Sequence, residues 1–273
     1  MAQRTVFING EAASAVEVGD RGLAYGHGIF ETMRIADAKI PLLSYHCARL
    51  MHGVEVLGIS LPKAVIADEI TAVLAQIPDS GVLKLLVTAG AGGRGYSAAC
   101  DLVPCRIYQW FPSPEVRPPA QLQVCSYTLP HNPVLAGLKH LNRLDQVLAA
   151  RELRDDHQGL VLDVGGNVIE AISQNLFMRC DGLWITPDLS QCGVSGVMRQ
   201  VLMKEVFPQI GDAVDESSFD LDRLLGCDEL FLCNAVMGIQ PVGGVGDGPR
   251  WNSFAKTRKI QAVLEERYPC FTA

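Results

Sequence analysis

One of the seven lysines in this 273-residue chain stands where it could act as a nucleophile. Lys139 directly precedes a segment in which Leu141, Leu144, Val147 and Leu148 recur at helical spacing. A lysine at such a junction can point into a cleft between domains, where the loss of water makes its amine nucleophilic. The alternative is a solvated lysine before a helix, and the spacing alone favours that alternative.

A single carboxylate interrupts an apolar stretch later in the chain. Glu170 is the only charged residue between Val164 and Met178, and the pattern predicts a strand in which it shares one face with Val168 and Ile172. An unpaired buried carboxylate is costly, so Glu170 needs a cationic partner. That partner is either a protonated ring nitrogen of a cofactor or an arginine elsewhere in the chain, and the spacing leaves both open.

Two glycine-containing segments could bind anions. The turn of residues 193–199 leads into an apolar helical pattern, so its backbone N–H groups and the helix dipole could attract an anion. It matches neither a phosphate-binding loop nor a dinucleotide fingerprint, and most such turns bind no ligand. The loop of residues 92–97 holds Arg94, whose guanidinium can offer a carboxylate two parallel donors. The alternative for this loop is a surface turn.

The N-terminal part of the sequence predicts strands and two helices that would position these residues. The expected elements are a hairpin with a strand over residues 5–8 and a turn at Asn9-Gly10, a second hairpin over residues 31–43 that turns near Asp37, a helix capped by Ser44 and ending about Leu57, a helix from Pro62 to about Ile77, and a strand over residues 81–87.

Four prolines within residues 111–120 indicate an extended linker, because the residue before a proline avoids the helical region. The linker separates a smaller N-terminal α/β domain, residues 1–110, from a larger C-terminal domain, residues 121–273. The elements expected in the larger domain are a strand over residues 122–127, a helix over residues 141–154, a hairpin over residues 159–173 and a helix over residues 254–267. Strands and helices do not alternate regularly, which predicts an α+β fold.

The composition limits the classes of function. Hydrophobic residues make up 48% and charged residues 19%, as in compact soluble enzymes. The net charge of -7 and the lack of a basic run argue against a nucleic-acid partner. No apolar run approaches the length of a membrane span, and the N-terminus lacks a secretory pattern, so we expect a cytoplasmic protein. Nine scattered cysteines without a C-x-x-C pair indicate reduced thiols and no metal site.

Read as an ordered set, short segments across both domains resemble the class IV, pyridoxal-phosphate-dependent aminotransferase family, and within it the lyases that act on 4-amino-4-deoxychorismate. The resemblance covers nearly the whole chain and implies a two-domain fold like that of D-amino-acid aminotransferases, with the cofactor in the interdomain cleft. The matching segments are Phe7 to Gly10, Asp20 to Gly22, Gly26 to Thr32, His46 to Leu50, Gly92 to Ser97, Lys139 to Leu144, Glu170 to Phe177, Gly193 to Gln200 and Cys233 to Met237.

The resemblance implies a role in cofactor binding for several residues. Lys139 is similar to the lysine that forms the Schiff base and then acts as the base, and Glu170 to the carboxylate that keeps the pyridine nitrogen protonated. Arg49 is similar to the arginine that binds the phosphate. Asn175 would order the cofactor loop. The remaining cofactor-binding positions, most of them backbone donors to the phosphate, would be Gly196, Val197, Met198, Asn234 and Ala235.

The resemblance also implies an activity. The expected reaction is the conversion of 4-amino-4-deoxychorismate to 4-aminobenzoate and pyruvate, in folate biosynthesis, by a homodimer. The substrate carries two carboxylates, for which Arg94 is the preferred partner, and His27, Tyr96 and Thr32 are further substrate-binding candidates. A D-amino-acid or branched-chain aminotransferase of the same fold is the alternative, and a non-catalytic binding protein is a third possibility that Lys139 and Glu170 disfavour.

Two positions depart from patterns of the family. Branched-chain aminotransferases usually place a tyrosine where this chain has Arg143, which argues against that subgroup. In the glycine turn, Met198 stands where the family frequently has a hydroxyl residue, so a side-chain bond to phosphate is lost there while the backbone donors remain.

Overall fold

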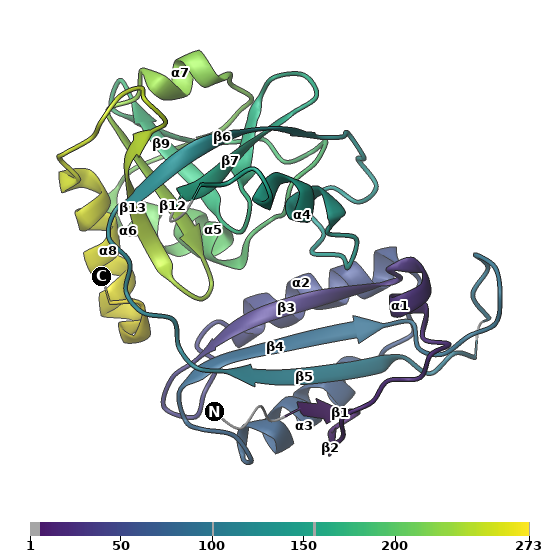
Figure 1. Ribbon diagram of the computed structural model, residues 1–273. Coiled ribbons are helices and arrows are strands. Elements are labelled where there is room, and N and C mark those ends of the chain that lie inside the picture. The colour runs from purple at the N-terminus through teal and green to yellow at the C-terminus, as the bar shows by residue number, and fades with distance from the viewer. Residues whose placement is uncertain (1–5, 100, 155–156, 273) are drawn as a thin grey trace. The chain divides into compact units, whose positions relative to one another are not determined.

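The structure is a computed structural model, and it describes residues 6–99, 101–154 and 157–272 (Figure 1). The chain forms two compact units: unit 1 comprises Met1–Pro114 and Leu138–Asn142, and unit 2 comprises Glu115–Gly137 and Arg143–Ala273. The chain first passes from unit 1 to unit 2 within the proline-rich segment 111–120. Residues 138–142, which the sequence assigned to the C-terminal domain, instead group with unit 1.

Unit 1 is a five-stranded antiparallel sheet with two helices packed on one face. The strand order is β2-β1-β5-β4-β3. Its elements are β1 Val6–Ile8, β2 Glu11–Ala12, α1 Arg21–Tyr25, β3 Gly28–Ile35, α2 Leu43–Val56, α3 Lys63–Leu74, β4 Gly81–Thr88 and β5 Cys105–Phe111.

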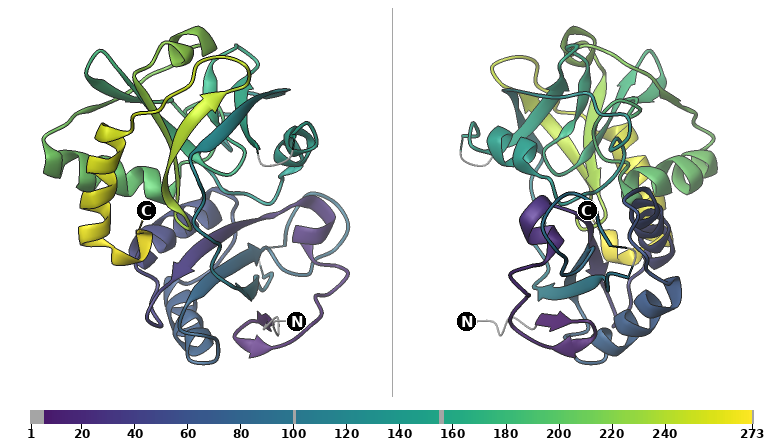
Figure 2. Two further views of the ribbon diagram at one scale, coloured as in Figure 1. Left: turned by 60° about the vertical axis from the view of Figure 1, so that its left-hand side comes forward. Right: turned by 90° about the vertical axis from the view of Figure 1, so that its right-hand side faces the viewer.

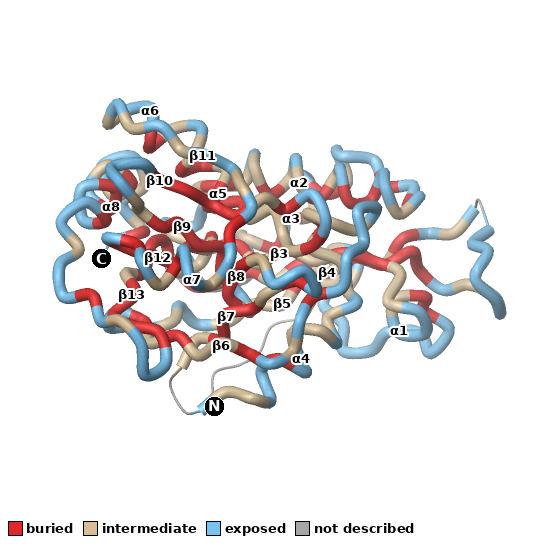
Figure 3. Tube along the Cα trace, turned by 90° about the horizontal axis from the view of Figure 1, so that it is seen from above, coloured by how far each residue is buried: buried red, intermediate tan, exposed pale blue. Residues whose placement is uncertain are grey.

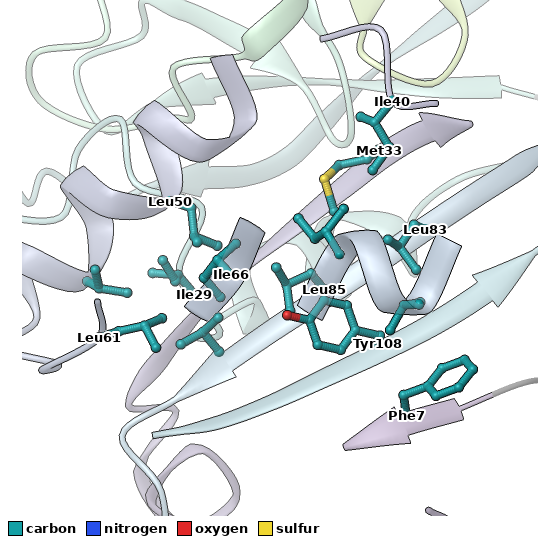
Figure 4. Packing of buried hydrophobic residues seen from close by; sticks show 14 of the residues in the cluster. Phe7, Ile29, Met33, Ile40, Leu50, Leu61, Ile66, Leu83, Leu85 and Tyr108 are labelled. Carbon is teal, nitrogen blue, oxygen red and sulfur yellow. The ribbon is translucent and has the colours of Figure 1, made fainter. Parts of the chain in front are cut away.

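The core of unit 1 lies between the sheet and the helices α2 and α3 (Figure 4). Leu50 of α2 and Ile66 of α3 pack with Ile29, Leu85 and Tyr108 of the sheet. Along β3 every second residue is buried, as the period of two in a strand requires. The same alternation buries Glu31, which makes this carboxylate an exception in an apolar layer.

Several sequence predictions for unit 1 are confirmed. The first hairpin turns at Asn9 and Gly10, both of which have positive φ, and β1 pairs with β2. Thr5, predicted to begin this hairpin, lies outside the described residues. The helix predicted to end about Leu57, the helix predicted from Pro62 and the strand predicted over residues 81–87 are present as α2, α3 and β4.

Two predictions for unit 1 are wrong in part. A tight turn forms at Asp37 and Ala38, but the chain returns only as a single bridge between Ala36 and Lys39. The partner of β3 is β4, over its whole length, because that pairing buries the apolar face of both strands. Ser44 does not cap α2; the cap position is Leu42, which offers no side-chain acceptor.

Unit 2 is built on an eight-stranded mixed sheet of order β11-β10-β9-β12-β13-β6-β7-β8. Its strands are β6 Ala120–Leu129, β7 His157–Asp163, β8 Val168–Ala171, β9 Asn175–Cys180, β10 Leu183–Thr186, β11 Val214–Glu216, β12 Glu229–Asn234 and β13 Gly238–Val245. Its helical segments are α4 Leu144–Ala150, α5 Val197–Val201, a π-helical turn Leu202–Val206, α6 Phe207–Ile210, α7 Leu221–Leu225, α8 Ala255–Arg267 and a 3₁₀ turn Pro269–Phe271.

Strands β9 and β12 are buried along most of their length (Figure 3). Phe177 and Phe231 stack with ring centroids 5.1 Å apart, and Trp184 and Phe207 pack against them. Helix α8, yellow in Figure 2, packs against the π-helical turn Leu202–Val206 and α6. Its first turn is fixed by Glu229, whose carboxylate accepts backbone N–H bonds from Lys256 and Thr257.

The hairpin over residues 159–173 and the last helix are confirmed as β7, β8 and α8. The helix predicted from Leu141 is shorter, because the backbone N–H of Leu141 is bonded to Gly28, the first residue of β3, and α4 begins only at Leu144. Its apolar positions Leu144, Val147 and Leu148 are exposed. Among the described residues, no helix is long and apolar enough to cross a membrane.

Candidate functional site

The segment that carries Lys139 continues the sheet of unit 1. The N–H of Phe30 donates to the carbonyl of Lys139, and the N–H of Leu141 donates to the carbonyl of Gly28, each at 2.9 Å. This pairing brings Lys139 beside Phe30, with its Nζ 4.5 Å from the centroid of the aromatic ring. An ammonium group over a ring face is stabilised by the ring's quadrupole. The structure therefore fixes the direction of Lys139 through both its backbone and its side chain.

Two glycines make this close approach possible. A Cβ at Gly28 would lie 2.3 Å from the carbonyl oxygen of Val87 and 2.7 Å from a methyl carbon of Leu141. A Cβ at Gly26 would lie 1.9 Å from the side-chain oxygen of Asn142, and Gly26 also has a φ of +64°. Side chains at these positions would displace residues 138–142. The Gly-His-Gly sequence at residues 26–28 thus sets the position of Lys139.

A buried ion-pair cluster lies where α2 packs on β3. Both carboxylate oxygens of Glu31 are paired with Arg49: Oε1 accepts from Nε at 2.7 Å, and Oε2 accepts from Nη2. Oε2 also lies 2.6 Å from Nδ1 of His46. His46 and Arg49 are three residues apart on α2, so both side chains reach one carboxylate from the same helix face.

The protonation states in this cluster follow from its geometry. Burial alone would raise the pKa of Glu31, but Arg49 and His46 outweigh burial and lower it to about 2. Burial lowers the pKa of His46, and Arg49 and Lys139 act in the same direction while Glu31 opposes them. Because Glu31 is ionised, Nδ1 of the neutral His46 must carry the proton that it donates. Nε2 of His46 is buried and has no hydrogen-bond partner within the residues that the structure describes.

In unit 2, Glu170 lies buried on β8 and binds the glycine turn. Its Oε2 accepts from the backbone N–H of Val194 at 2.9 Å and from the side-chain amide of Asn175 at 3.4 Å. The amide of Asn175 also donates to the carbonyl of Val194 at 2.9 Å. Val168 and Ile172 pack in different clusters, so the predicted shared face does not extend to Ile172, which follows the end of the strand.

The glycine turn is tightly packed. A Cβ at Gly196 would lie 1.9 Å from Oδ1 of Asn175. The turn is also bonded to Gly137, whose N–H donates to Gly193 and whose carbonyl accepts from Ser195. Gly137 is the last residue of unit 2 before the segment with Lys139, so the glycine turn holds one end of the connection that leads to this lysine.

Helix α5 begins directly after the glycine turn. Gly196 is its cap residue, and no side chain of the described chain caps this end. The first N–H groups of a helix have no acceptor within the helix, so those of Val197 and Met198 are suited to bind an anion. The side chains of Val197 and Met198 are buried, which leaves only their backbones for such a role.

Asn234 folds the turn between β12 and β13. Its Oδ1 accepts the backbone N–H groups of Val236 at 3.0 Å and Met237 at 2.8 Å. Ala235, next in the chain, is buried. Asn234 thus shapes the backbone around Ala235, and cofactor binding by either residue stays a prediction.

The loop of residues 92–97 is held by Arg21 of α1. Arg21 donates from Nη1 to the carbonyl of Gly95 at 3.0 Å and from Nη2 to the carbonyl of Tyr96 at 2.6 Å. The ring centroids of Tyr25 and Tyr96 lie 5.6 Å apart. The hydroxyl of Tyr25 accepts from the backbone N–H of Gly95. Arg94 itself is exposed, and Tyr96 is 89% exposed.

The other two substrate candidates lie elsewhere in unit 1. His27 accepts from Nε of Arg21 at 3.3 Å through Nδ1, and its Nε2 lies 2.9 Å from the carbonyl of Leu57. Both ring nitrogens are therefore engaged within the unit. Thr32 lies on β3, paired in register with Lys84, and points away from the helix-covered face that buries Glu31 and Met33.

The predicted residues thus fall into two groups. Unit 1 holds Lys139, Arg49, Arg94, Tyr96, His27 and Thr32, and unit 2 holds Glu170, Asn175, Gly196, Val197, Met198, Asn234 and Ala235. Within unit 2 the structure brings Glu170, Asn175 and the glycine turn together.

No role was predicted from the sequence for Glu31, His46, Phe30 or Arg21. A signal for Glu31 was present: it is a lone charge among Ile29, Met33 and Ile35, the same pattern that singled out Glu170. The contacts of Phe30 and Arg21 are made with residues far along the chain, and no local pattern reveals them.

Burial suppresses the reactivity of two cysteines of unit 2. No disulfide joins any of the cysteines that the structure describes. Burial raises the pKa of Cys125 to about 11 and that of Cys192 to about 12, so both remain protonated and unreactive near neutral pH.

The chain is similar to known proteins over most of its length. The family described as amino-transferase class IV matches residues 28–245 of the chain. An aminodeoxychorismate lyase of Vibrio harveyi is 33% identical over 270 residues, which cover 94% of this chain and 98% of that protein.

Solved structures agree with this match. The crystal structure of a 4-amino-4-deoxychorismate lyase from Pseudomonas aeruginosa has a TM-score of 0.91 and 40% identity, and the likeness covers 96% of this chain and 98% of that one. A branched-chain amino acid aminotransferase from T.th., solved with pyridoxamine 5'-phosphate, has a TM-score of 0.84 at 21% identity, over 97% of this chain and 94% of that one. At that identity the second likeness shows the α+β fold alone.

Proposed function

The chain belongs to the class IV aminotransferase family, and we propose that it is a lyase that converts 4-amino-4-deoxychorismate to 4-aminobenzoate and pyruvate with pyridoxal 5'-phosphate as its cofactor. The observation that carries the proposed reaction is the likeness, over nearly the whole chain, to proteins named as lyases of this substrate. The folate pathway follows from the product 4-aminobenzoate.

The chain's residues fit the proposed cofactor. A pyridine aldehyde with a phosphate needs an amine for the aldehyde, an anion for the ring nitrogen, and cations or N–H groups for the phosphate. Lys139, Glu170 and Arg49 supply these three groups, and the uncapped start of α5 supplies N–H donors.

The chain's own residues can perform the proton transfer that the reaction needs. When bound, the cofactor supplies an electron-withdrawing ring next to the substrate's amino carbon. Lys139 is the base that takes the proton from that carbon. By taking up this proton Lys139 becomes an ammonium group over the Phe30 ring, which stabilises the positive charge. Glu170 is held by Val194 and Asn175, so its carboxylate has a fixed orientation toward the turn.

The two carboxylates of the substrate need cationic or hydrogen-bonding partners. Arg94 remains the preferred partner, because its exposed guanidinium sits on a loop whose backbone Arg21 fixes. Thr32 and Tyr96 are further candidates. His27 is a weaker one, since both of its ring nitrogens already have partners in unit 1.

A homodimer is part of this proposal. Helix α4 leaves Leu144, Val147 and Leu148 exposed at 74%, 52% and 42% in the single chain. Three neighbouring apolar side chains on one short helix favour coverage by another protein surface. A cytoplasmic location is also proposed, supported by the lack of disulfides among the described cysteines.

The cofactor assignment is tested by borohydride reduction. The purified protein should be yellow, and reduction should fix the pyridoxyl group on the peptide that contains Lys139, as read by mass spectrometry. A colourless protein that pyridoxal 5'-phosphate leaves unchanged would remove the enzyme proposal. The lyase is distinguished from a transaminase because the lyase releases pyruvate without an added keto acid.

A further inference from the structure

We propose that Glu31 and His46 are positioning residues that orient Arg49 toward the phosphate of the cofactor. This inference rests on the proposed function, in which Arg49 binds that phosphate. Both residues lie within unit 1. Glu31 bonds directly to Arg49 and to His46, so His46 reaches Arg49 through the carboxylate of Glu31.

The geometry of the pair between Glu31 and Arg49 fixes the guanidinium. Nε and Nη2 each bond a different oxygen of one carboxylate, so the two planar groups are held side by side. Such a two-point pair sets the plane of the guanidinium and with it the directions of all its N–H bonds. The side chains of Arg49 and Glu31 are only 9% and 3% exposed, so water does not loosen the pair.

His46 holds the carboxylate from its other side. Its Nδ1 donates to the oxygen that also accepts from Nη2 of Arg49. The carboxylate of Glu31 thus has three N–H donors from one helix, and it cannot rotate without breaking at least one bond. The orientation of Arg49 therefore depends on both partners.

The cost of this arrangement argues against a purely structural role. Glu31 takes a place between Ile29 and Met33 in the buried register of β3, where an apolar residue would pack without desolvating a charge. His46 is 1% exposed, and its Nε2 lacks a hydrogen-bond partner within the described chain. An imidazole with an unsatisfied nitrogen costs stability at this buried position. The bond from its Nδ1 to Glu31, which helps to orient Arg49, accounts for its presence.

The test compares the affinity of the apoprotein for pyridoxal 5'-phosphate with its affinity for pyridoxal, which lacks the phosphate. Both affinities are measured by absorbance titration, without substrate. In Glu31→Gln, the affinity for pyridoxal 5'-phosphate should fall about tenfold while the affinity for pyridoxal stays unchanged. Equal affinities in the variant and the wild type, or an equal loss for both ligands, would overturn the inference.

Two variants of His46 test whether its hydrogen-bond donor is needed: one keeps a donor and the other removes it. His46→Asn keeps a donor near the place of Nδ1 and removes the unsatisfied Nε2, so it should retain the wild-type preference for the phosphorylated ligand. His46→Leu removes the donor and should lose part of that preference. If both variants keep the preference, His46 is not a positioning residue, even if both change thermal stability.

Unit 1 contains a matched control. Glu69 pairs with Nε and Nη2 of Arg106 and accepts from the hydroxyl of Tyr108, so it has the same kind of three-donor cluster without Arg49. Glu69→Gln should lower the melting temperature and leave the preference for phosphate unchanged. A wild-type protein that binds neither ligand would refute the proposed function itself, whereas a wild type that binds normally beside an unaffected Glu31→Gln would refute only this inference.

Discussion

The amine of Lys139 lies 4.5 Å from the centroid of the Phe30 ring, on a segment whose backbone is bonded to the same strand. Phe30 therefore takes part both in placing Lys139 and in stabilising its protonated form. In Phe30→Leu the backbone bonds remain and the aromatic face is lost.

We expect Phe30→Leu to lower kcat about fivefold, which corresponds to about 1 kcal/mol of cation–π stabilisation. Steady-state kinetics with 4-amino-4-deoxychorismate give this value. Lys84 also lies over this ring, with its Nζ 5.6 Å from the centroid, so Lys84→Met tests whether the effect passes through the second lysine. An unchanged kcat in Phe30→Leu would show that the ring does not support the proton transfer.

Glu31 should make the protein sensitive to acid. Its pKa is lowered from 4.5 to about 2 in the folded chain, because Arg49 and His46 outweigh the effect of burial. A depressed carboxylate pKa contributes stability that is present above pH 4.5 and is lost as the pH falls toward 2. The contribution is on the order of a few kcal/mol.

Urea unfolding measured at several pH values checks this prediction. The free energy of unfolding of the wild type should fall between pH 4.5 and 2 more steeply than that of Glu31→Gln. His46 makes stability fall with pH already below 6.5. Its pKa is lowered in the folded chain, so protonation favours the unfolded chain. Parallel curves for the two proteins would contradict the charge state assigned to Glu31.

Arg21 should control the mobility of the loop that carries Arg94. Two carbonyls of the loop, those of Gly95 and Tyr96, accept from the two Nη groups of Arg21. A lysine has a single ammonium group and cannot reproduce this fork. In Arg21→Lys we expect faster hydrogen exchange in residues 92–97 and a higher KM with little change in kcat. Unchanged exchange in the loop would rule out the tether.

Gly196→Ala should disturb the contacts of Asn175 through a side-chain clash, not through backbone strain. Gly196 has a φ of -66°, which alanine adopts, but the added Cβ would lie 1.9 Å from Oδ1 of Asn175. Asn175 must then move and weaken its bonds to Glu170 and Val194.

We expect Gly196→Ala to lose about 1–3 kcal/mol of stability and to bind pyridoxal 5'-phosphate more weakly. Thermal denaturation and an absorbance titration give the two values. Gly93→Ala is the control, since a Cβ there meets nothing within 4 Å. A Gly196→Ala protein that resembles Gly93→Ala in both measurements would show that this packing is unimportant.

Local patterns in the sequence predicted much of the fold. The Asn9-Gly10 turn, the helix after Pro62 and the final helix follow from dihedral preferences and apolar spacing, which depend on neighbouring residues. The segment of residues 138–142 was not predictable in this way. Its bonds to Gly28 and Phe30 join residues more than a hundred positions apart, and they override the helical pattern that begins at Leu141.

The candidate site was partly predictable for the same reason. Glu170 stood out because a lone charge in an apolar strand needs a partner, and the structure supplies Val194 and Asn175. Glu31 follows the same rule. It was missed because the predicted hairpin began at residue 31, whereas β3 begins at Gly28 and Glu31 lies inside the strand.

Release of pyruvate from 4-amino-4-deoxychorismate by the holoenzyme, without any amino acceptor, decides between a lyase and a transaminase. The proposed lyase predicts pyruvate and 4-aminobenzoate in equal amounts over many turnovers, and loss of both products in Lys139→Ala. Product that forms only after a keto acid is added would contradict the lyase and favour a transaminase.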